Sequence, residues 1–558
     1  MENNQNNQKR PKATKLDKVV GNLYRKKEEE LTANLALKAG LEYANLANFQ
    51  PEPDVVGLIP QETTEEFKVF PYKKEGRKVY VATLDKLDPK IEKLFKEQYP
   101  EYKFLPVLVS DSNMRYLLSI YSVFAPSEKD PKDLKITGIE QKNKAKTISE
   151  WEELAKNIKN IPVSELFEIM IASAAHFEAS DIHIEPTKTA IELRFRIDGV
   201  LQDVAELPTS FLSGIINRTK ILSELKLNVV ESSQDGRFSI DIGKIHYDIR
   251  VSILPTAYGE SAVLRLLPQT GKFIDLEKLG LEGSNAEIIN SIIKKPNGLI
   301  LNTGPTGSGK TTTLYAILDK INSPDKKIIT IEDPIEYRLK GITQSQINPE
   351  ENYTFATGLK AILRQDPDII LVGEIRDKDT ANIAINASLT GHLVLSTLHT
   401  NNAAGAIPRL ADLGLKPSYF IESILAVIAQ RLLRKLCPEC AEEYSPSPEE
   451  LEIINQELED LPENIAKPNI KTLKRPPQNP KTQCSVCNGL GYKGRIGIFE
   501  ILQTNNEIVK AVLASATIGD IETLAKKNGM ITLKQDGILK VIQGVTTLEE
   551  LNRVAGRN

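Results

Sequence analysis

Cysteine, aromatic residues and excess charge are all scarce in this chain of 558 residues. Four cysteines in so long a chain cannot form the disulfide framework that stabilises small secreted domains. Aromatic residues make up 6% of the sequence, and 71 basic residues are balanced by 75 acidic ones, which leaves a net charge of −4. The sequence therefore lacks both the basic surplus and the stacking side chains typical of nucleic-acid-binding proteins.

Long hydrophobic runs are also missing. No apolar segment reaches about 18 residues, the length that suggests a membrane-spanning helix. The stretch Met1 to Lys18 is polar and basic and has no apolar signal-peptide core, so we expect a cytoplasmic protein. Hydrophobic residues still make up 41% of the chain, enough for folded cores. The length predicts about three or four domains.

The segment 304–311, Gly-Pro-Thr-Gly-Ser-Gly-Lys-Thr, matches the phosphate-binding P-loop. An apolar run at 298–302 precedes it and a predicted helix follows, so backbone N–H groups and a helix start would surround phosphate oxygens. Lys310 would reach the β- and γ-phosphates, and the Thr311 hydroxyl would hold Mg²⁺. The alternative is a glycine-rich turn that matches by chance. The predicted nucleotide-binding residues are Gly304, Pro305, Thr306, Gly307, Ser308, Gly309, Lys310, Thr311 and Thr312.

Three more apolar strands are predicted after the P-loop, at 328–331, 369–372 and 393–396, with helical segments between them. This pattern predicts a parallel sheet covered on both faces. Polar residues follow each strand, and ligands of open α/β sheets bind beyond the carboxyl ends of the strands. We therefore expect these polar residues to converge on the P-loop.

Those strand ends supply the groups that nucleotide hydrolysis needs, a carboxylate near Mg²⁺ and a group that orients the attacking water. Glu374 suits the magnesium side, and Glu332 or Glu336 suits the water. Each acid could instead cap the following helix. His392 and His399 could sense phosphate, although a lone histidine is more often structural.

The part of the chain before the P-loop predicts a tail and two small α+β domains. Helical spacing at 31–44 and short strands at 69–72 and 79–82 indicate the first domain. Two hairpins indicate the second, and alternation places Arg237 and Arg250 on polar strand faces, which could simply be solvated. The predicted parts are a disordered tail or docking arm at 1–30, a first domain at 31–125, a linker at 126–158, a second domain at 159–270, a linker at 271–285 and the P-loop domain at 286–558.

All four cysteines fall in two C-x-x-C pairs, Cys437 with Cys440 and Cys484 with Cys487. Four thiolates are what tetrahedral structural Zn²⁺ needs, and zinc would pin the two ends of the insertion between the pairs. A thiol redox pair is the alternative, but it would not need two copies. A helix is predicted just before the first pair, through Ile421, Ile424, Leu425, Ile428 and Leu432.

These motifs together resemble the secretion-superfamily ATPases of the type IV pilus extension and type II secretion kind, from about residue 30 to 558. Residues 330–336 resemble the family's Asp box, 368–376 its Walker B motif and 390–400 its His box. The segments 180–186, 196–199, 234–237 and 250–252 resemble signatures of its second N-terminal domain.

The resemblance implies a homohexamer with a RecA-like motor domain, ATP as nucleotide, a PAS-like sheet in the second N-terminal domain and a zinc-pinned C-terminal insertion. It favours Glu336 over Glu332 as the water-activating acid. It also implies that Arg237 and Arg250 reach a nucleotide, with Arg265 a weaker candidate. The expected catalytic residues are therefore Glu336, Glu374, Arg237, Arg250, Glu332 and His399.

The family's first N-terminal domain docks on inner-membrane partners, which implies a peripheral position at that membrane and a platform protein as partner. Some relatives bind cyclic di-GMP through an arginine- and glycine-led motif that residues 1–30 lack, so this ligand is not expected. The resemblance implies an ATP-driven motor for pilus or pseudopilus assembly. The alternatives are a nucleic-acid translocase with the same core, or a scaffold that binds nucleotide without hydrolysing it.

Overall fold

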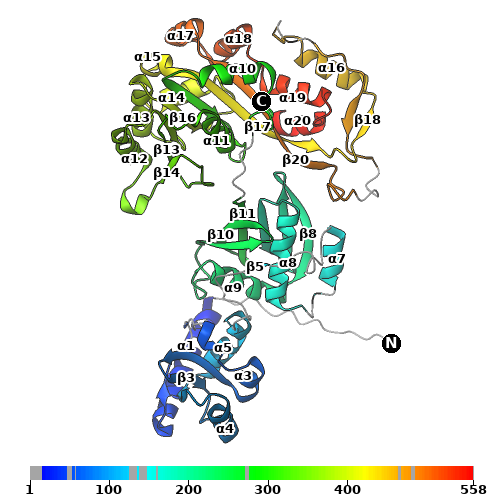
Figure 1. Ribbon diagram of the computed structural model, residues 1–558. Helices are drawn as coiled ribbons and strands as arrows, with labels where there is room; N and C mark the ends of the chain where they lie inside the picture. The colour runs from blue at the N-terminus through cyan, green and yellow to red at the C-terminus, as the bar shows by residue number, and fades with distance from the viewer. Residues whose placement is uncertain are drawn as a thin grey trace. The chain divides into compact units, whose positions relative to one another are not determined.

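The computed structural model describes residues 15–46, 49, 53–56, 58–124, 135–136, 148–156, 158, 161–269, 275–462, 465, 467–478 and 484–556. They form two compact units, one up to Pro268 and one from Gln269, with Asp198–Val200 counted in the second (Figure 1). No helix within these residues is long and apolar enough to cross a membrane.

The first described element is a helix, in a segment where the sequence predicts a disordered tail. Helix α1 spans Lys15–Ala39, so that prediction is wrong for residues 15–30, while residues 1–14 lie outside the described part. Leu16, Val19 and Leu23 recur at helical spacing between the charged residues, a signal that the bulk composition hides.

A four-stranded sheet in the order β1-β4-β3-β2 forms the first domain. The predicted hairpin is confirmed: β2 and β3 are antiparallel and turn at Gly76. The elements are β1 (Glu42–Tyr43), β2 (Val69–Glu75), β3 (Lys78–Thr83), β4 (Lys103–Leu108), α2 (Pro53–Val56), α3 (Gln61–Phe67), α4 (Pro89–Gln98) and α5 (Asp111–Phe124).

A seven-stranded sheet in the order β5-β9-β10-β11-β6-β7-β8 follows. Both predicted hairpins are confirmed, and the first turns on Asp198 and Gly199, with positive φ angles of 48° and 85°. The elements are β5 (Lys135–Ile136), α7 (Ile148–Lys156), α8 (Val163–His176), β6 (Asp181–Pro186), β7 (Ala190–Ile197), β8 (Val200–Pro208), α9 (Leu212–Leu222), β9 (Gln234–Ile242), β10 (Ile245–Thr256) and β11 (Gly259–Pro268).

Both predicted linkers contain packed structure and are therefore wrong where they are described. Helix α7 lies within 126–158, and its Trp151 is fully buried, edge-to-face with Phe195. In the second linker, Leu276 and Leu281 are buried in the core of the P-loop domain. Leaving an apolar side chain in water is unfavourable, so the few apolar residues of these segments pack into the neighbouring cores.

The P-loop domain is built on a seven-stranded sheet in the order β14-β13-β15-β16-β12-β17-β20, parallel except for β20. The strands are β12 (Gly298–Thr303), β13 (Ile328–Glu332), β14 (Thr343–Gln346), β15 (Ile369–Val372), β16 (Leu393–Leu398), β17 (Ile424–Leu436) and β20 (Tyr492–Gln503). The remaining short strands are β18 (Glu442–Tyr444) and β19 (Leu473–Arg475).

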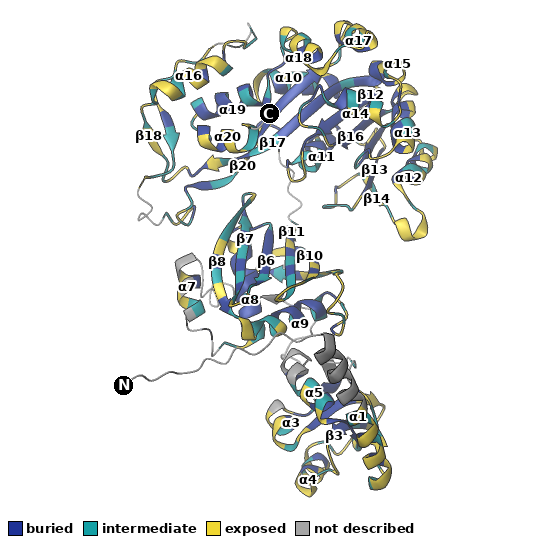
Figure 2. Cartoon of the chain, turned by 180° about the vertical axis from the view of Figure 1, so that it is seen from behind, coloured by how far each residue is buried: buried dark blue, intermediate teal, exposed yellow. Residues whose placement is uncertain are grey.

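Alternate residues of these strands enter two separate cores, one on each face of the sheet. Leu299 and Leu301 pack with the helices on one side, whereas Ile300 packs against α10 and α11 on the other. Figure 2 shows the central strands in the dark blue of buried residues. The predicted α/β architecture with a doubly covered parallel sheet is confirmed. The helices are α10 (Gly283–Ile292), α11 (Lys310–Ile321), α12 (Phe355–Ile362), α13 (Lys378–Leu389), α14 (Ala406–Asp412), α15 (Pro417–Phe420), α16 (Pro448–Glu457), α17 (Asn506–Leu513), α18 (Ile518–Lys527), α19 (Leu533–Ile542) and α20 (Leu548–Ala555).

The predicted helix through Ile424, Ile428 and Leu432 is wrong. These residues belong to β17, which pairs in parallel with β12 and antiparallel with β20. A central strand is apolar on both faces, so its residues at spacings of three and four mimic a helical stripe. Pairing with two neighbouring strands, which local spacing cannot reveal, decides the structure.

Candidate functional site

The P-loop connects the buried strand β12 to helix α11, as predicted. Gly304, Gly307 and Gly309 have φ angles of 154°, 79° and 88°, a region that L side chains rarely adopt, so glycine is required here. The Lys310 ammonium donates to the carbonyls of Gly304, at 2.7 Å, and Pro305, at 3.1 Å. Burial lowers the pKa of Lys310 to about 8, an effect that the nearby Glu374 opposes. Phosphate oxygens would replace these carbonyls, and their negative charge would raise this pKa again.

The two threonines that begin α11, Thr311 and Thr312, are half-buried next to the loop. The other predicted loop residues differ in exposure: Pro305 and Thr306 are exposed, whereas Ser308 is buried. The loop therefore presents backbone groups and the start of a helix to solvent at the carboxyl edge of the sheet.

Glu374 lies at the same edge, just after β15. Its carboxylate pairs with Arg376 at 2.5 Å and lies 3.6 Å from Nε2 of His399. Burial lowers the pKa of His399 and the charge of Lys310 adds to this effect, while the neighbouring Glu374 opposes it. The structure thus gathers Lys310, Glu374 and His399, which are far apart in the sequence, as predicted from the strand ends.

His392, the other candidate histidine, lies at the opposite edge of the sheet. It precedes β16, its ring nitrogen Nδ1 lies 3.0 Å from the carbonyl of Ala387, and its own carbonyl accepts the N–H of Gly298 at the start of β12. The structure therefore does not place His392 beside the P-loop of its own chain, in contrast to His399. A parallel strand separates its two ends by about 3.3 Å per residue, so a residue before β16 cannot share a site with one after it.

Glu332 is buried in a polar network rather than open to solvent. Its carboxylate accepts hydrogen bonds from Tyr315, Thr330 and Gln344, and only 3% of the residue is exposed. Burial raises the pKa of Glu332, and these hydrogen bonds oppose the effect. Glu336, in the loop after β13, is half-buried.

Strand β17 supplies two side chains at the P-loop, Gln430 and Arg431, that the sequence patterns do not identify. Gln430 accepts from the Asn302 amide at 3.0 Å, beneath the loop, and its Nε2 would lie 2.8 Å from a Cβ at Gly309. Arg431 donates to the carbonyl of Asn401 at 2.7 Å. Because β17 looks helical in sequence, no signal placed these side chains beside the nucleotide motif.

The candidate arginines of the second domain form a row across its sheet. Arg237 lies directly opposite Arg250, and Arg250 lies opposite Arg265. Asp181, almost fully buried, binds Nε of Arg265 at 2.8 Å and that of Arg196 at 3.5 Å. Like charges directly opposite each other destabilise a sheet, and Asp181 compensates the Arg265 end of this row.

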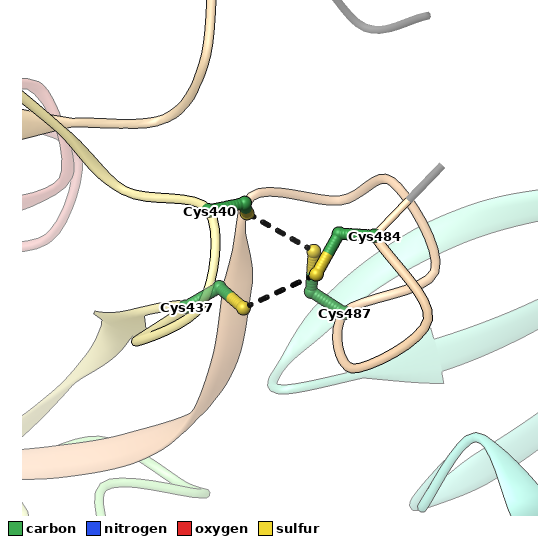
Figure 3. A group of neighbouring side chains, drawn as sticks. All are labelled: Cys437, Cys440, Cys484 and Cys487. Carbon is green, nitrogen blue, oxygen red and sulfur yellow. Dashed lines mark hydrogen bonds between the residues drawn. The ribbon is translucent and has the colours of Figure 1, made fainter. Parts of the chain in front are cut away.

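The four cysteines come together in space. Their Sγ atoms lie within 4.8 Å of one another, at 3.7 Å for Cys437–Cys484 and 3.6 Å for Cys440–Cys487 (Figure 3). Sulfurs at the corners of a tetrahedron with metal–sulfur bonds of about 2.3 Å are separated by about 3.8 Å. The backbone N–H of Gly491 also donates to Cys487 Sγ at 3.3 Å. The donor set and its spacing fit a tetrahedral metal ion.

Comparison with known proteins agrees with this geometry. Residues 156–553 match the type II/IV secretion system protein family, and residues 39–126 match the MshEN domain. The chain is 37% identical over 529 residues to the type IV pilus assembly ATPase PilB of Thermus thermophilus, and the alignment covers 94% of this chain but 57% of that relative. It therefore spans little more than half of that relative's length.

A second relative, the type II secretion system protein E of Aeromonas hydrophila, is 44% identical over 411 residues, which are 74% of this chain and 79% of the relative. The solved ATPase DotB of Legionella pneumophila shares the fold, with a TM-score of 0.50 and 23% identity over 70% of this chain and 94% of that one. The expected resemblance is thus confirmed: the chain belongs to the type II/IV secretion system protein family.

Proposed function

We propose that this chain is a Mg²⁺-dependent ATPase that drives assembly of a type IV pilus or of the pseudopilus of a type II secretion system. The observation that carries the proposal is the P-loop with Lys310 at the same sheet edge as Glu374 and His399. Membership of the family supplies the link to pilus and secretion systems. The relative named for pilus assembly aligns over 94% of this chain and the one named for secretion over 74%, which favours the pilus.

The residues of the loop would bind and orient the triphosphate. Backbone N–H groups of 304–311 and the Lys310 ammonium would hold the β- and γ-phosphates, and Thr311 with Glu374 would hold Mg²⁺, directly or through water. When bound, Mg²⁺ would neutralise charge on the phosphates. Glu336 would position and deprotonate the attacking water, since the carboxylate of Glu332 is already occupied by three donors.

The arginine row would act on the same reaction. An arginine that faces a γ-phosphate stabilises the charge of the transition state. The family resemblance assigns this role to Arg237 and Arg250, whereas Arg265 pairs with Asp181. The proposal includes a homohexamer in which such arginines complete the nucleotide sites. It also includes docking on an inner-membrane platform protein, with the motor in a peripheral position at the cytoplasmic side of that membrane.

Zinc is the metal that we propose for the four cysteines. A Cys₄ set is typical of structural zinc and leaves no open position for chemistry. The ion would join the β17 end to the segment that leads into β20. Metal analysis should find about one zinc per chain; its absence from protein purified without chelators would contradict the assignment. Cyclic di-GMP is not proposed, because residues 1–30, upstream of the MshEN match, lack the arginine- and glycine-led motif.

The test is ATP turnover by the purified full chain with Mg²⁺, compared with Lys310→Ala. We expect hydrolysis that disappears in the variant and on Mg²⁺ chelation. Equal turnover in both proteins would overturn the site. Deleting the gene in its host, and scoring surface pili against secreted proteins, separates the two systems.

A further inference from the structure

An arginine outside the recognised motifs, Arg431, lies at the edge of the P-loop. On β17, Ala429 pairs with Thr303, the last residue of β12. Arg431 lies two residues after Ala429 on the same strand. A Cβ at Gly304 would lie 3.1 Å from Nη1 of Arg431. The guanidinium therefore packs against the first residue of the phosphate-binding loop.

Two backbone carbonyls hold this guanidinium in place. Nη1 donates to Gln430 at 2.9 Å, and Nη2 donates to Asn401 at 2.7 Å. Asn401 belongs to the loop after β16 that also carries His399, and Thr400 of this loop donates its N–H to Thr303 at 2.8 Å. Arginine has five N–H donors, so these bonds fix its orientation and leave others for a ligand.

The charge of Arg431 is not neutralised by a salt bridge to any described residue. The carboxylate whose charge attracts it, Glu500, accepts backbone N–H groups of Ala403 at 2.8 Å and Leu533 at 3.4 Å. A second cation, Lys310, binds the Gly304 carbonyl at 2.7 Å, and the two positive charges disfavour each other. Two half-buried cations beside one glycine therefore favour the binding of a further anion, in addition to the nearby Glu374 and Glu500.

We propose that Arg431 is a nucleotide-binding residue whose guanidinium contacts a phosphate of the nucleotide in the P-loop. The inference rests on the proposed function, because it requires that the loop binds nucleotide. It adds a cation from β17 to those from the loop itself. Through Asn401, the same guanidinium would connect phosphate binding to the loop that carries His399.

Equilibrium binding of ATP and ADP to the full chain tests this, with Arg431→Gln and Arg431→Lys compared with wild type. A hydrogen bond from a charged donor contributes about 1.5–3 kcal/mol, so Arg431→Gln should weaken ATP binding roughly ten- to a hundredfold. Arg431→Lys should bind at least threefold more tightly than the glutamine variant, since it keeps the charge. Comparing the loss of affinity for ATP with that for ADP identifies the phosphate: a loss for ATP alone indicates the γ-phosphate, and an equal loss for both indicates a phosphate that ADP also carries.

Lys435→Gln is the matched control, because Lys435 is an exposed cation on the same strand and should leave affinity unchanged. Increasing salt should weaken ATP binding less in Arg431→Gln than in wild type. If the glutamine and lysine variants bind ATP equally, Arg431 acts only through the carbonyls and the inference is wrong. Thermal unfolding without nucleotide checks that each variant is folded. If Lys310→Ala loses ATP binding while both Arg431 variants bind ATP like wild type, the inference is wrong but the proposed function stands. If Lys310→Ala binds ATP like wild type, the proposed function itself is wrong.

Discussion

Glu332 and Glu336 lie four residues apart but have different surroundings. Glu332 is the last residue of β13, and its carboxylate is surrounded by Tyr315, Thr330 and Gln344. The Tyr315 ring also packs edge-to-face against Tyr337, with centroids 4.7 Å apart. A carboxylate that accepts from this many donors holds β13, β14 and α11 in position relative to one another. It is poorly placed to orient and deprotonate a water molecule.

We therefore expect opposite results from two matched substitutions. Glu336→Gln should retain ATP binding but lower turnover by roughly 10²–10⁴, since the amide cannot accept a proton. Glu332→Gln should lower the thermal unfolding temperature and keep most of the turnover per folded molecule. Single-turnover hydrolysis and calorimetry measure both quantities. A Glu332→Gln variant that binds ATP with full stability but no hydrolysis, together with an active Glu336→Gln, would reverse the assignment.

At the scale of elements, helix α20 is fastened to the end of β17 by a buried ion pair. Glu550 is 1% exposed and accepts from Arg434, at 2.8 Å, and from Arg553, at 2.6 Å. Arg434 also stacks on the Tyr492 ring, 4.1 Å from its centroid. Because β17 also carries Arg431, this contact lies on the strand that reaches the P-loop.

The pKa of Glu550 predicts how this contact responds to acid. Burial alone would raise the pKa, but the hydrogen bonds from Arg553 and Arg434 outweigh burial and lower the pKa to about 2. A group whose pKa falls on folding contributes stability above its unfolded value of about 4.3, and this contribution is lost as the pH drops towards 2. The contribution at neutral pH is about 3 kcal/mol.

Glu550→Gln should thus lower the thermal unfolding temperature of the P-loop domain clearly at pH 7 and much less near pH 3. Glu549→Gln is the control, because Glu549 is exposed on the same helix turn. Calorimetric unfolding across this pH range gives the comparison. An equal loss at both pH values would mean that packing, rather than charge, fastens α20.

At the scale of the whole molecule, the two compact units carry different parts of the proposed reaction. The P-loop domain carries Lys310 in its phosphate-binding motif, and the sheet of the second domain carries the row that contains Arg237 and Arg250. An arginine on a sheet face contributes little to stability, but a γ-phosphate contact contributes about 10³–10⁵ in rate. The proposed cycle brings these arginines to the nucleotide on ATP binding and releases them after hydrolysis.

Arg237→Ala and Arg250→Ala should therefore lower turnover strongly while oligomer size and nucleotide affinity stay close to wild type. Mixing either variant with Glu336→Gln asks whether the arginines act across subunits, since mixed rings would contain interfaces with an intact arginine and an intact glutamate. Partial recovery of turnover supports action across subunits. Full activity of both arginine variants would refute their role.

The sequence alone determined the features that depend on neighbouring residues. The P-loop is a continuous segment whose glycines are required by local φ angles, and both hairpins of the second domain depend on two-residue turns. The paired C-x-x-C segments likewise predicted a four-cysteine cluster, which the structure confirms. The P-loop and the hairpin turns, and each C-x-x-C pair by itself, are signals that lie within a few residues, whereas the two cysteine pairs meet only in the folded chain.

Only the tertiary structure decided the features that depend on distant partners. The segment 424–436 is a strand because β12 and β20 pair with it, although its spacing resembles a helix. The same pairing brings Arg431 to the P-loop, and a three-dimensional network buries Glu332 while Glu336 stays half-buried. His392 and His399 belong to one motif, but the length of β16 separates them to opposite edges of the sheet. Burial and strand pairing are sums over non-local contacts, which one-dimensional spacing does not contain.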